Sequence, residues 1–149
     1  MITILLLSVA GAVIAAIVGT LWYSMATPMG KIHMRYLGMD KLSEQERKKK
    51  MEEAKPTMWM IYVAQLILSF LTAFWVVFVV TESVHNRLSL WMAFAFPVLS
   101  WLCFIVPTIG SGLLWSNSDR KTAWQEFFSH ILCNLVTILL IAFMTSFFL

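Results

Sequence analysis

Four long runs of apolar residues dominate the pattern of the chain. None of the four contains Lys, Arg or Asp, and they cover about residues 2–23, 58–80, 88–114 and 123–149. A helix needs roughly 20 predominantly apolar residues to cross a bilayer, and the backbone groups within the hydrocarbon must bond inside their own segment. The pattern therefore predicts an all-α integral membrane bundle of about four transmembrane helices, forming a single domain over residues 1–149.

Composition supports this prediction. Of the 149 residues, 60% are hydrophobic and 13% are charged, whereas a soluble domain is roughly half apolar and a quarter charged. The first run is longer than the roughly 7–15 apolar residues of a signal peptide and has no positive segment before it, so we expect a retained span. Cys103 and Cys133 both lie within predicted spans, where reduced packing side chains are expected.

Basic residues are distributed unequally between the predicted loops. The first loop, residues 24–56, and the third loop together hold ten Lys and Arg residues, whereas the second loop holds Arg87 alone. Because Lys and Arg accumulate on the cytoplasmic side, both basic loops are predicted inside and both termini outside. Aromatic residues suited to the headgroup region lie near the predicted cytoplasmic ends, namely Trp22, Tyr23, Trp59, Tyr62, Trp115 and Trp124.

The cytoplasmic loop between the first two spans is predicted to contain two helices. Residues 29–39 place apolar side chains at helical spacing, which is typical of an amphipathic helix at the membrane surface, and Gly38 is expected to end it. Ser43 and Glu46 form an S-x-x-E capping box that predicts the start of the second helix. Pro56 is expected to stop this helix and to begin the next span.

The run Arg47-Lys48-Lys49-Lys50 has two interpretations. One is a site for anionic lipid or nucleic acid, and the other is a solvated charge cluster that sets the topology. Acidic residues flank the run, and the interleaved aromatics of a nucleic-acid site are missing from it. We therefore favour solvated charge and expect no nucleic-acid partner.

Polar side chains inside the predicted spans are the candidate functional residues, because such groups are costly in hydrocarbon. Glu126 and His130 are four residues apart, so their side chains can touch. They are interpreted as a ligand-binding pair or a proton relay, the alternative being a hydrogen-bonding contact between helices. Depth counted from the cytoplasmic ends predicts a polar pocket, open to the cytoplasm, that is lined by Glu126, His130, Asn134, Gln65, Thr108 and Thr20.

Two further features concern the shape and packing of the helices. Pro97 and Pro107 each remove a backbone hydrogen bond from the third span and predict kinks. The residues after Pro107 are also compatible with a partly unwound segment that binds a ligand. Small residues on the first helix predict a close-packed seam that either seals the bundle or joins two subunits, namely Ser8, Gly11, Ala12, Ala15, Ala16 and Gly19.

No metal or cofactor site is predicted. His33 lies in the cytoplasmic loop, His85 in the outer loop and His130 in the fourth span, so three histidines are not expected to converge within a protomer. Haem would need His130 from two copies of a symmetric dimer. Since the sequence contains no nucleophile, phosphate-loop or dinucleotide motif, an enzyme is the weakest functional class.

Three short motifs carry a resemblance to a known family. LWYS at residues 21–24, Gly30-Lys31, and FIVPT at residues 104–108 resemble motifs of the small bacterial membrane proteins grouped as domain of unknown function 1761. The resemblance implies about four spans in a bacterial cytoplasmic (inner) membrane and no established activity. The family-like positions are Gly19, Trp22, Tyr23, Ser24, Gly30, Lys31, Pro107 and Trp124.

This chain also departs from the family pattern in two places. Met25 stands where the family usually has Pro after L-W-Y-S. In the fourth span His130 precedes Asn134, whereas the family order is Asn and then His.

Two functions are compatible with these features. The first is binding or transport of a lipid, an amphiphile or a proton-coupled small solute through the polar pocket. A homo-oligomer is expected for this function because four spans are few for a transporter. The second is an accessory or scaffolding subunit whose polar stripe and small residues pack against a partner membrane protein. Membrane lipids surround the protein in both cases.

Reporter fusions test the predicted orientation. A reporter that is active only in the cytoplasm should work after Lys55 and Arg120, because these positions belong to the basic loops. It should fail after Asn86 and Leu149. Cytoplasmic activity of the fusion after Leu149 would contradict the orientation.

Overall fold

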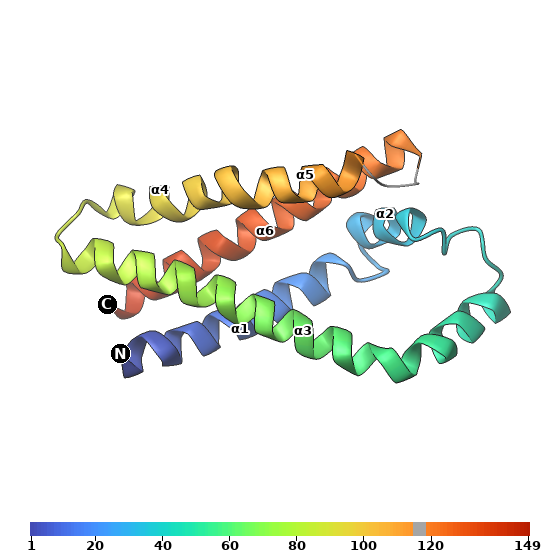
Figure 1. Ribbon diagram of the computed structural model, residues 1–149, viewed down its shortest axis with the longest axis horizontal. Coiled ribbons are helices and arrows are strands. Elements are labelled where there is room, and N and C mark those ends of the chain that lie inside the picture. Colours follow the sequence, from blue (N-terminus) through green and yellow to red (C-terminus); the bar gives the residue numbers. More distant parts are fainter. Residues whose placement is uncertain (115–118) are drawn as a thin grey trace.

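The computed structural model of the protein describes residues 1–114 and 119–149, and the regular structure within them is entirely helical (Figure 1). Four helical stretches are long and apolar enough to cross a membrane. The predicted all-α bundle of four spans is confirmed. The elements are α1 (Ile2–Trp22), α2 (Pro28–Tyr36), α3 (Glu44–His85), α4 (Leu90–Ser100), the π-helical turn η1 (Trp101–Ile105), α5 (Val106–Leu114) and α6 (Arg120–Phe148).

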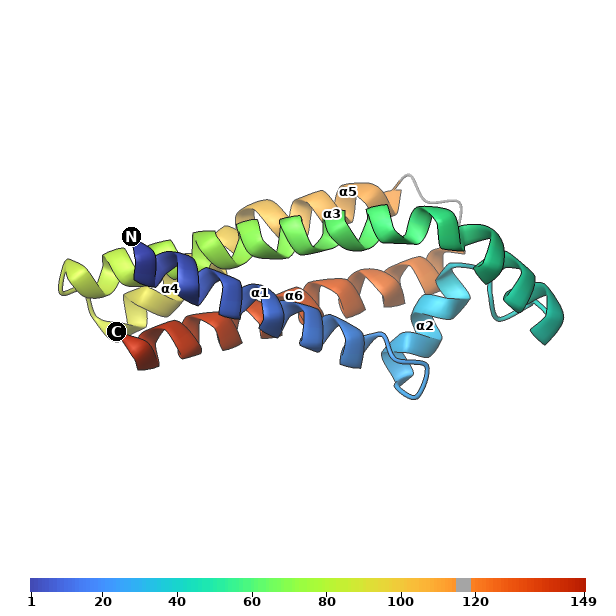
Figure 2. The ribbon, with the colours of Figure 1, turned by 90° about the horizontal axis from the view of Figure 1, so that it is seen from below.

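The helices lie lengthwise beside one another, and both termini are at the same end of the bundle (Figures 1 and 2). Helix α1 packs against α3 and α6, and α4 packs against the same two helices. The opposite end carries α2, the start of α3 and the start of α6, and we call it the basic end. There the short helix α2 packs against α6.

The core lies where α1, α3 and α6 meet. Ala73, Val77 and Ile141 are completely buried there. Gly11 fits between α3 and α6, because a Cβ atom at this position would lie 2.9 Å from the Cβ of Ala73. The seam therefore seals the bundle at its buried members, which are Ser8, Gly11 and Ala12. Ala15 and Ala16 are partly buried, and nothing lies within 4 Å of a Cβ built on Gly19.

The third span stays helical through both of its prolines. Between Pro97 and Pro107 the backbone forms a π-helical turn, in which the N–H of Val106 donates to the carbonyl of Trp101. A π turn adds a residue to the helix and is one of the recognised origins of a kink. The alternative of unwinding after Pro107 is wrong, because α5 continues as an α-helix to Leu114.

The two helices predicted in the loop are both present, with one difference. Helix α2 ends at Tyr36, and Gly38 adopts a φ of 68° just beyond it. The capping box is confirmed, since the side chains of Ser43 and Glu46 each accept a hydrogen bond from the other residue's backbone N–H. The stop predicted at Pro56 is wrong, because α3 runs on to His85.

The surroundings of Pro56 explain why α3 continues through this residue. The proline removes only one backbone hydrogen bond, and the residues of the preceding turn are exposed, so water can solvate the freed carbonyl. Helix α3 bends where its colour passes from green to teal in Figure 1. Trp115, which the sequence assigns to the membrane interface, lies outside the described residues.

Candidate functional site

The site depends on how α2 is attached to the end of α1. Thr27 caps α2, because its hydroxyl accepts a hydrogen bond from the N–H of Gly30 at 3.0 Å. The same hydroxyl lies 2.7 Å from the carbonyl oxygen of Trp22, to which it donates. Pro28 at the first helical position suits this start, since its missing N–H would have no partner within the helix. The turn between α1 and α2 is therefore fixed by bonds at both of its ends.

Gly30 brings α2 close to this turn. A Cβ atom at position 30 would lie 2.0 Å from the carbonyl oxygen of Ser24 and 2.8 Å from that of Tyr23. No side chain can occupy that space, so only glycine permits the approach. The turn is also tied to α6, because the indole N–H of Trp22 donates to the hydroxyl of Ser129 at 3.0 Å. We call Trp22, Tyr23, Ser24, Thr27 and Gly30 the α1–α2 joint.

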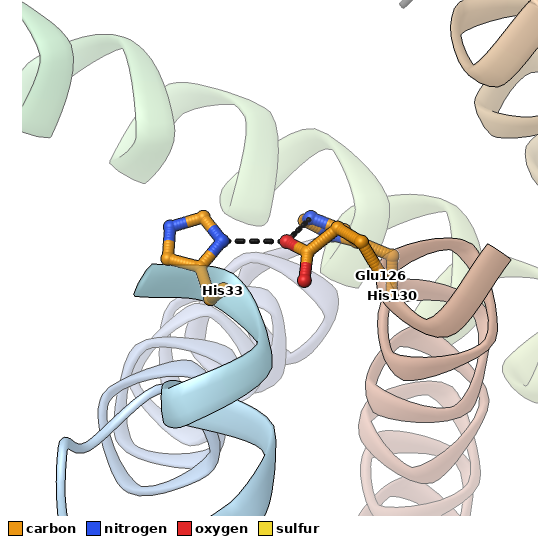
Figure 3. Close-up of side chains that lie close together, drawn as sticks. All are labelled: His33, Glu126 and His130. Carbon is orange, nitrogen blue, oxygen red and sulfur yellow. Dashed lines mark hydrogen bonds and ion pairs between the residues drawn. The ribbon is translucent and has the colours of Figure 1, made fainter. Parts of the chain in front are cut away.

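The joint places His33 of α2 against Glu126 of α6. The Nδ1 atom of His33 lies 2.5 Å from Oε1 of Glu126, and the Nε2 atom of His130 lies 3.0 Å from the same oxygen. Figure 3 shows the two imidazoles meeting at this one oxygen, while the other carboxylate oxygen is engaged by neither. The spacing of Glu126 and His130 along α6 accounts for their contact, as the sequence predicts.

Burial makes the Glu126 carboxylate unusual. Glu126 is 3% exposed, and its Oε2 atom has no hydrogen-bond partner among the described residues. The hydroxyl of Tyr23 is likewise buried and without a partner among them. The ring of Tyr23 lies 5.0 Å from that of His33 and 5.2 Å from that of His130, measured between centroids. A buried carboxylate is costly unless it is paired, and the two histidines are the partners that the described residues give to Oε1.

The start of α6 is fixed independently of these contacts. Asp119 caps the helix, and its side chain accepts a hydrogen bond from the N–H of Thr122 at 3.0 Å. Hydrogen bonding with Thr122 holds the pKa of the Asp119 carboxyl below its usual value. The cap therefore stays ionised and anchors the turns of α6 that carry Glu126 and His130.

The other four predicted pocket residues do not join this cluster. Asn134 is partly buried and donates to the carbonyl of His130 within α6. Thr20 and Thr108 are exposed and donate to carbonyls of their own helices, those of Ala16 and Phe104. Gln65 is exposed as well, with its amide nitrogen 3.4 Å from the hydroxyl of Ser69. Of the six predicted residues, the structure brings only Glu126 and His130 into side-chain contact.

His33 is the site residue that the sequence reasoning missed. From sequence, His33 is assigned to the loop and His130 to the fourth span, whereas the structure brings the two together, with their ring centroids 6.2 Å apart. His33 follows Gly30 by three residues and so shares roughly the same side of α2 as the close approach. That spacing is the signal that could have identified it. His85 stays exposed at the end of α3 away from this site.

The remaining family-like residues have other surroundings. Lys31 is exposed on α2, on the basic end. Trp124 is half exposed on α6 and packs against Phe127 and Phe128, edge to face against the first and tilted against the second, at centroid distances of 5.5 and 5.9 Å. Neither residue contributes to the cluster around Glu126.

The cluster also has the composition of a metal-ligand set. One ligand atom from each of His33, Glu126 and His130 can be chosen so that all three lie within 4.8 Å of one another. His33 and His130 have side chains that are 32% and 38% exposed, while that of Glu126 is 4% exposed. The arrangement can hold either a hydrogen-bonded carboxylate or a small cation.

Comparison with known proteins gives one match. The model of the family described as "Protein of unknown function (DUF1761)" matches residues 6–146. No curated protein and no solved structure matches the chain. The match includes the α1–α2 joint and all three residues of the cluster.

Replacing Gly30 by Ala tests the role of the joint. The added Cβ should push α2 away from the Ser24 carbonyl, and such overpacking costs roughly 1–3 kcal/mol. Tryptic cleavage after Lys31 and Arg35, followed by mass spectrometry, should then be about tenfold faster, because the opened state is more populated. Gly112→Ala is the matched control, since a Cβ there meets nothing within 4 Å. Equal cleavage of both variants and wild type would show that α2 does not depend on Gly30.

Proposed function

The chain belongs to the family described as "Protein of unknown function (DUF1761)", and we propose that it binds a small cation at Glu126, at the basic end of the bundle. One observation carries the proposal. The Glu126 carboxylate is buried, two histidines share one of its oxygens, and the other oxygen is unpartnered among the described residues.

The energetics of a buried carboxylate favour a cationic ligand. Removing one ionised carboxylate from water costs several kcal/mol, and a positive partner with good geometry offsets this cost. Glu126 is the only charged residue among the buried residues that the structure describes. Each imidazole can donate an N–H to the carboxylate but brings no permanent charge. A bound cation supplies that charge directly.

Cavity size favours an ion over the larger ligands considered from the sequence. One cavity of about 300 Å³ is lined by apolar side chains together with Trp22 and Thr27 of the joint. A second, of about 270 Å³, lies between α3 and the third span. Neither is lined by His33, Glu126 or His130. Neither of these two cavities would place a lipid or amphiphile against the polar cluster, whereas an ion needs only the ligand atoms themselves.

The basic end is proposed to face the cytoplasm of a bacterial cell. Ten of the eleven Lys and Arg residues belong to the two loops at this end, and such an excess marks the cytoplasmic side. Both termini lie at the opposite end (Figure 1). The cation then enters from the cytoplasm, past the partly exposed rings of His33 and His130.

Binding, rather than passage through one protomer, is the activity we propose. The interior beyond the site is filled by buried apolar side chains, including Val76, Val80 and Ile141. Transport would require a second copy or a partner protein to complete a path. We favour binding over the scaffolding alternative because Ser8, Gly11 and Ala12, three of the small residues proposed to pack against a partner, pack inside the bundle.

Cation-dependent stabilisation tests the proposal. The midpoint of thermal unfolding is measured in detergent with Na⁺, K⁺, Mg²⁺, Ca²⁺, Mn²⁺, Zn²⁺ and tetramethylammonium added separately. A cation at about 100 times its Kd stabilises the folded state by roughly 2.7 kcal/mol. At least one cation should raise the midpoint of wild type and fail to raise that of Glu126→Gln, which keeps the size of the side chain without its charge.

Glu82→Gln is the control, because Glu82 is an exposed carboxylate near the other end of α3. It should respond to the cation as wild type does. The proposal is contradicted if no cation raises the midpoint, or if Glu126→Gln responds as strongly as wild type.

A further inference from the structure

We propose that the bound cation is a divalent transition-metal ion, Zn²⁺ or a first-row ion with the same ligand preference, held by His33, Glu126 and His130. This inference rests on the proposed cation-binding function and names the class of ion. It assigns Nδ1 of His33, a carboxylate oxygen of Glu126 and Nε2 of His130 as the ligands.

The distances suit a single ion after small side-chain movements. Zn²⁺ binds imidazole nitrogen and carboxylate oxygen at about 2.0–2.2 Å, which places two ligands of one ion roughly 3–4 Å apart. The two nitrogens now lie 2.5 and 3.0 Å from Oε1 of Glu126, and all three ligand atoms lie within 4.8 Å of one another. Separating each nitrogen slightly from the oxygen makes room for the ion at the centre.

The chemistry of the ligand atoms selects the class of metal. Mg²⁺ and Ca²⁺ prefer sites built from oxygen, whereas imidazole suits Zn²⁺ and the neighbouring transition metals. Here two ligands are imidazole nitrogens and one is a carboxylate oxygen. The same set without His33 would leave a two-ligand site, so the docking of α2 on α6 is what completes it.

The site is only partly enclosed by the protein. The side chains of His33 and His130 are about one-third exposed, so an ion can enter and water can take a remaining coordination position. Three protein ligands with an open position are typical of exchangeable or reactive zinc rather than structural zinc. The ring of Tyr23, which is partly buried, lies against both imidazoles and restricts their rotation.

A second observation points to a ligand independently of the histidines. Oε2 of Glu126 is buried, and none of the described residues bonds to it. A metal ion beside Oε1 gives this oxygen a role, either as a second ligand atom or as an acceptor for metal-bound water. The same ion would therefore give Oε2 of Glu126 the partner that the described residues do not provide.

The test measures metal binding to the full-length chain, free of any histidine tag and stripped with a chelator. Zn²⁺ affinity is determined in detergent by competition with a chelating dye, and Co²⁺ binding is followed by visible absorption. Wild type should bind one Zn²⁺ per chain, and Co²⁺ should give the intense bands of a low-coordinate site. His33→Ala and His130→Ala should each weaken Zn²⁺ binding by about 100-fold or more, beyond the 10–100-fold typical of an outer-shell loss.

Two further variants make the result specific. His85→Ala removes the third histidine of the chain, which is exposed and distant from the cluster, and should bind Zn²⁺ as wild type does. His33→Cys keeps a metal ligand at the same position. It should retain Zn²⁺ and add a thiolate-to-metal charge-transfer band to the Co²⁺ spectrum.

The outcomes separate this inference from the function on which it rests. Zn²⁺ binding that is unaffected by His33→Ala and His130→Ala, or no Zn²⁺ binding at all, overturns the metal site. If Na⁺, K⁺, Mg²⁺, Ca²⁺ or tetramethylammonium alone stabilises the protein through Glu126, the cation-binding function stands and the transition-metal class is wrong. If no cation acts through Glu126, both proposals fall.

Discussion

The close approach of α2 to the end of α1 is the constraint on which the site depends. At Gly30 the helix lies so near the carbonyls of Tyr23 and Ser24 that no side chain can be accommodated. Thr27 fixes the helix start, and Trp22 links the same turn to Ser129 of α6. Without this joint α2 would be an unattached surface helix, and His33 would not be held beside Glu126. The local backbone contact therefore determines a contact between residues 93 positions apart in sequence.

Glu126 differs from the other buried polar residues in how it is satisfied. Ser8, Thr137 and Thr145 donate to carbonyls four residues earlier in their own helices, which is a local solution open to any hydroxyl within a span. A carboxylate cannot donate in this way when it is ionised, so it needs partners from outside its own backbone. In this bundle the partners are two imidazoles from two helices. The cost of burying the carboxylate is the physical reason to expect a bound cation.

The architecture could be predicted from sequence because it follows from the length of apolar runs. The capping box at Ser43 and the contact of Glu126 with His130 were also predictable, since both depend on spacing within one helix. The helix end predicted at Pro56 is wrong, because one lost hydrogen bond at an exposed turn does not end a long helix. The prediction that Thr20 and Thr108 face the interior is wrong for a related reason. Their hydroxyls bond to their own helices and have no need to face the interior.

His33 could not be placed from sequence because its position depends on tertiary packing of a loop helix. Hydrophobic pattern assigns α2 to the membrane surface but does not say which helix it touches there. The close approach at Gly30 and the bond from Trp22 to Ser129 decide that, and both join segments that are separate in sequence. The LWYS and Gly30-Lys31 motifs indicated the family, but their role in forming the α1–α2 joint is visible only in the folded structure.

The interaction of His33 with Glu126 across α2 and α6 is measured most directly by a double-mutant cycle. Free energies of unfolding in detergent are determined for wild type, His33→Ala, Glu126→Gln and the double variant. Residues in direct contact show coupling of roughly 0.5–3 kcal/mol. A cycle of Glu126→Gln with His85→Ala should be additive, because His85 lies far from the site. Additivity in the His33 cycle as well would mean that α2 does not dock as described, and would contradict the account.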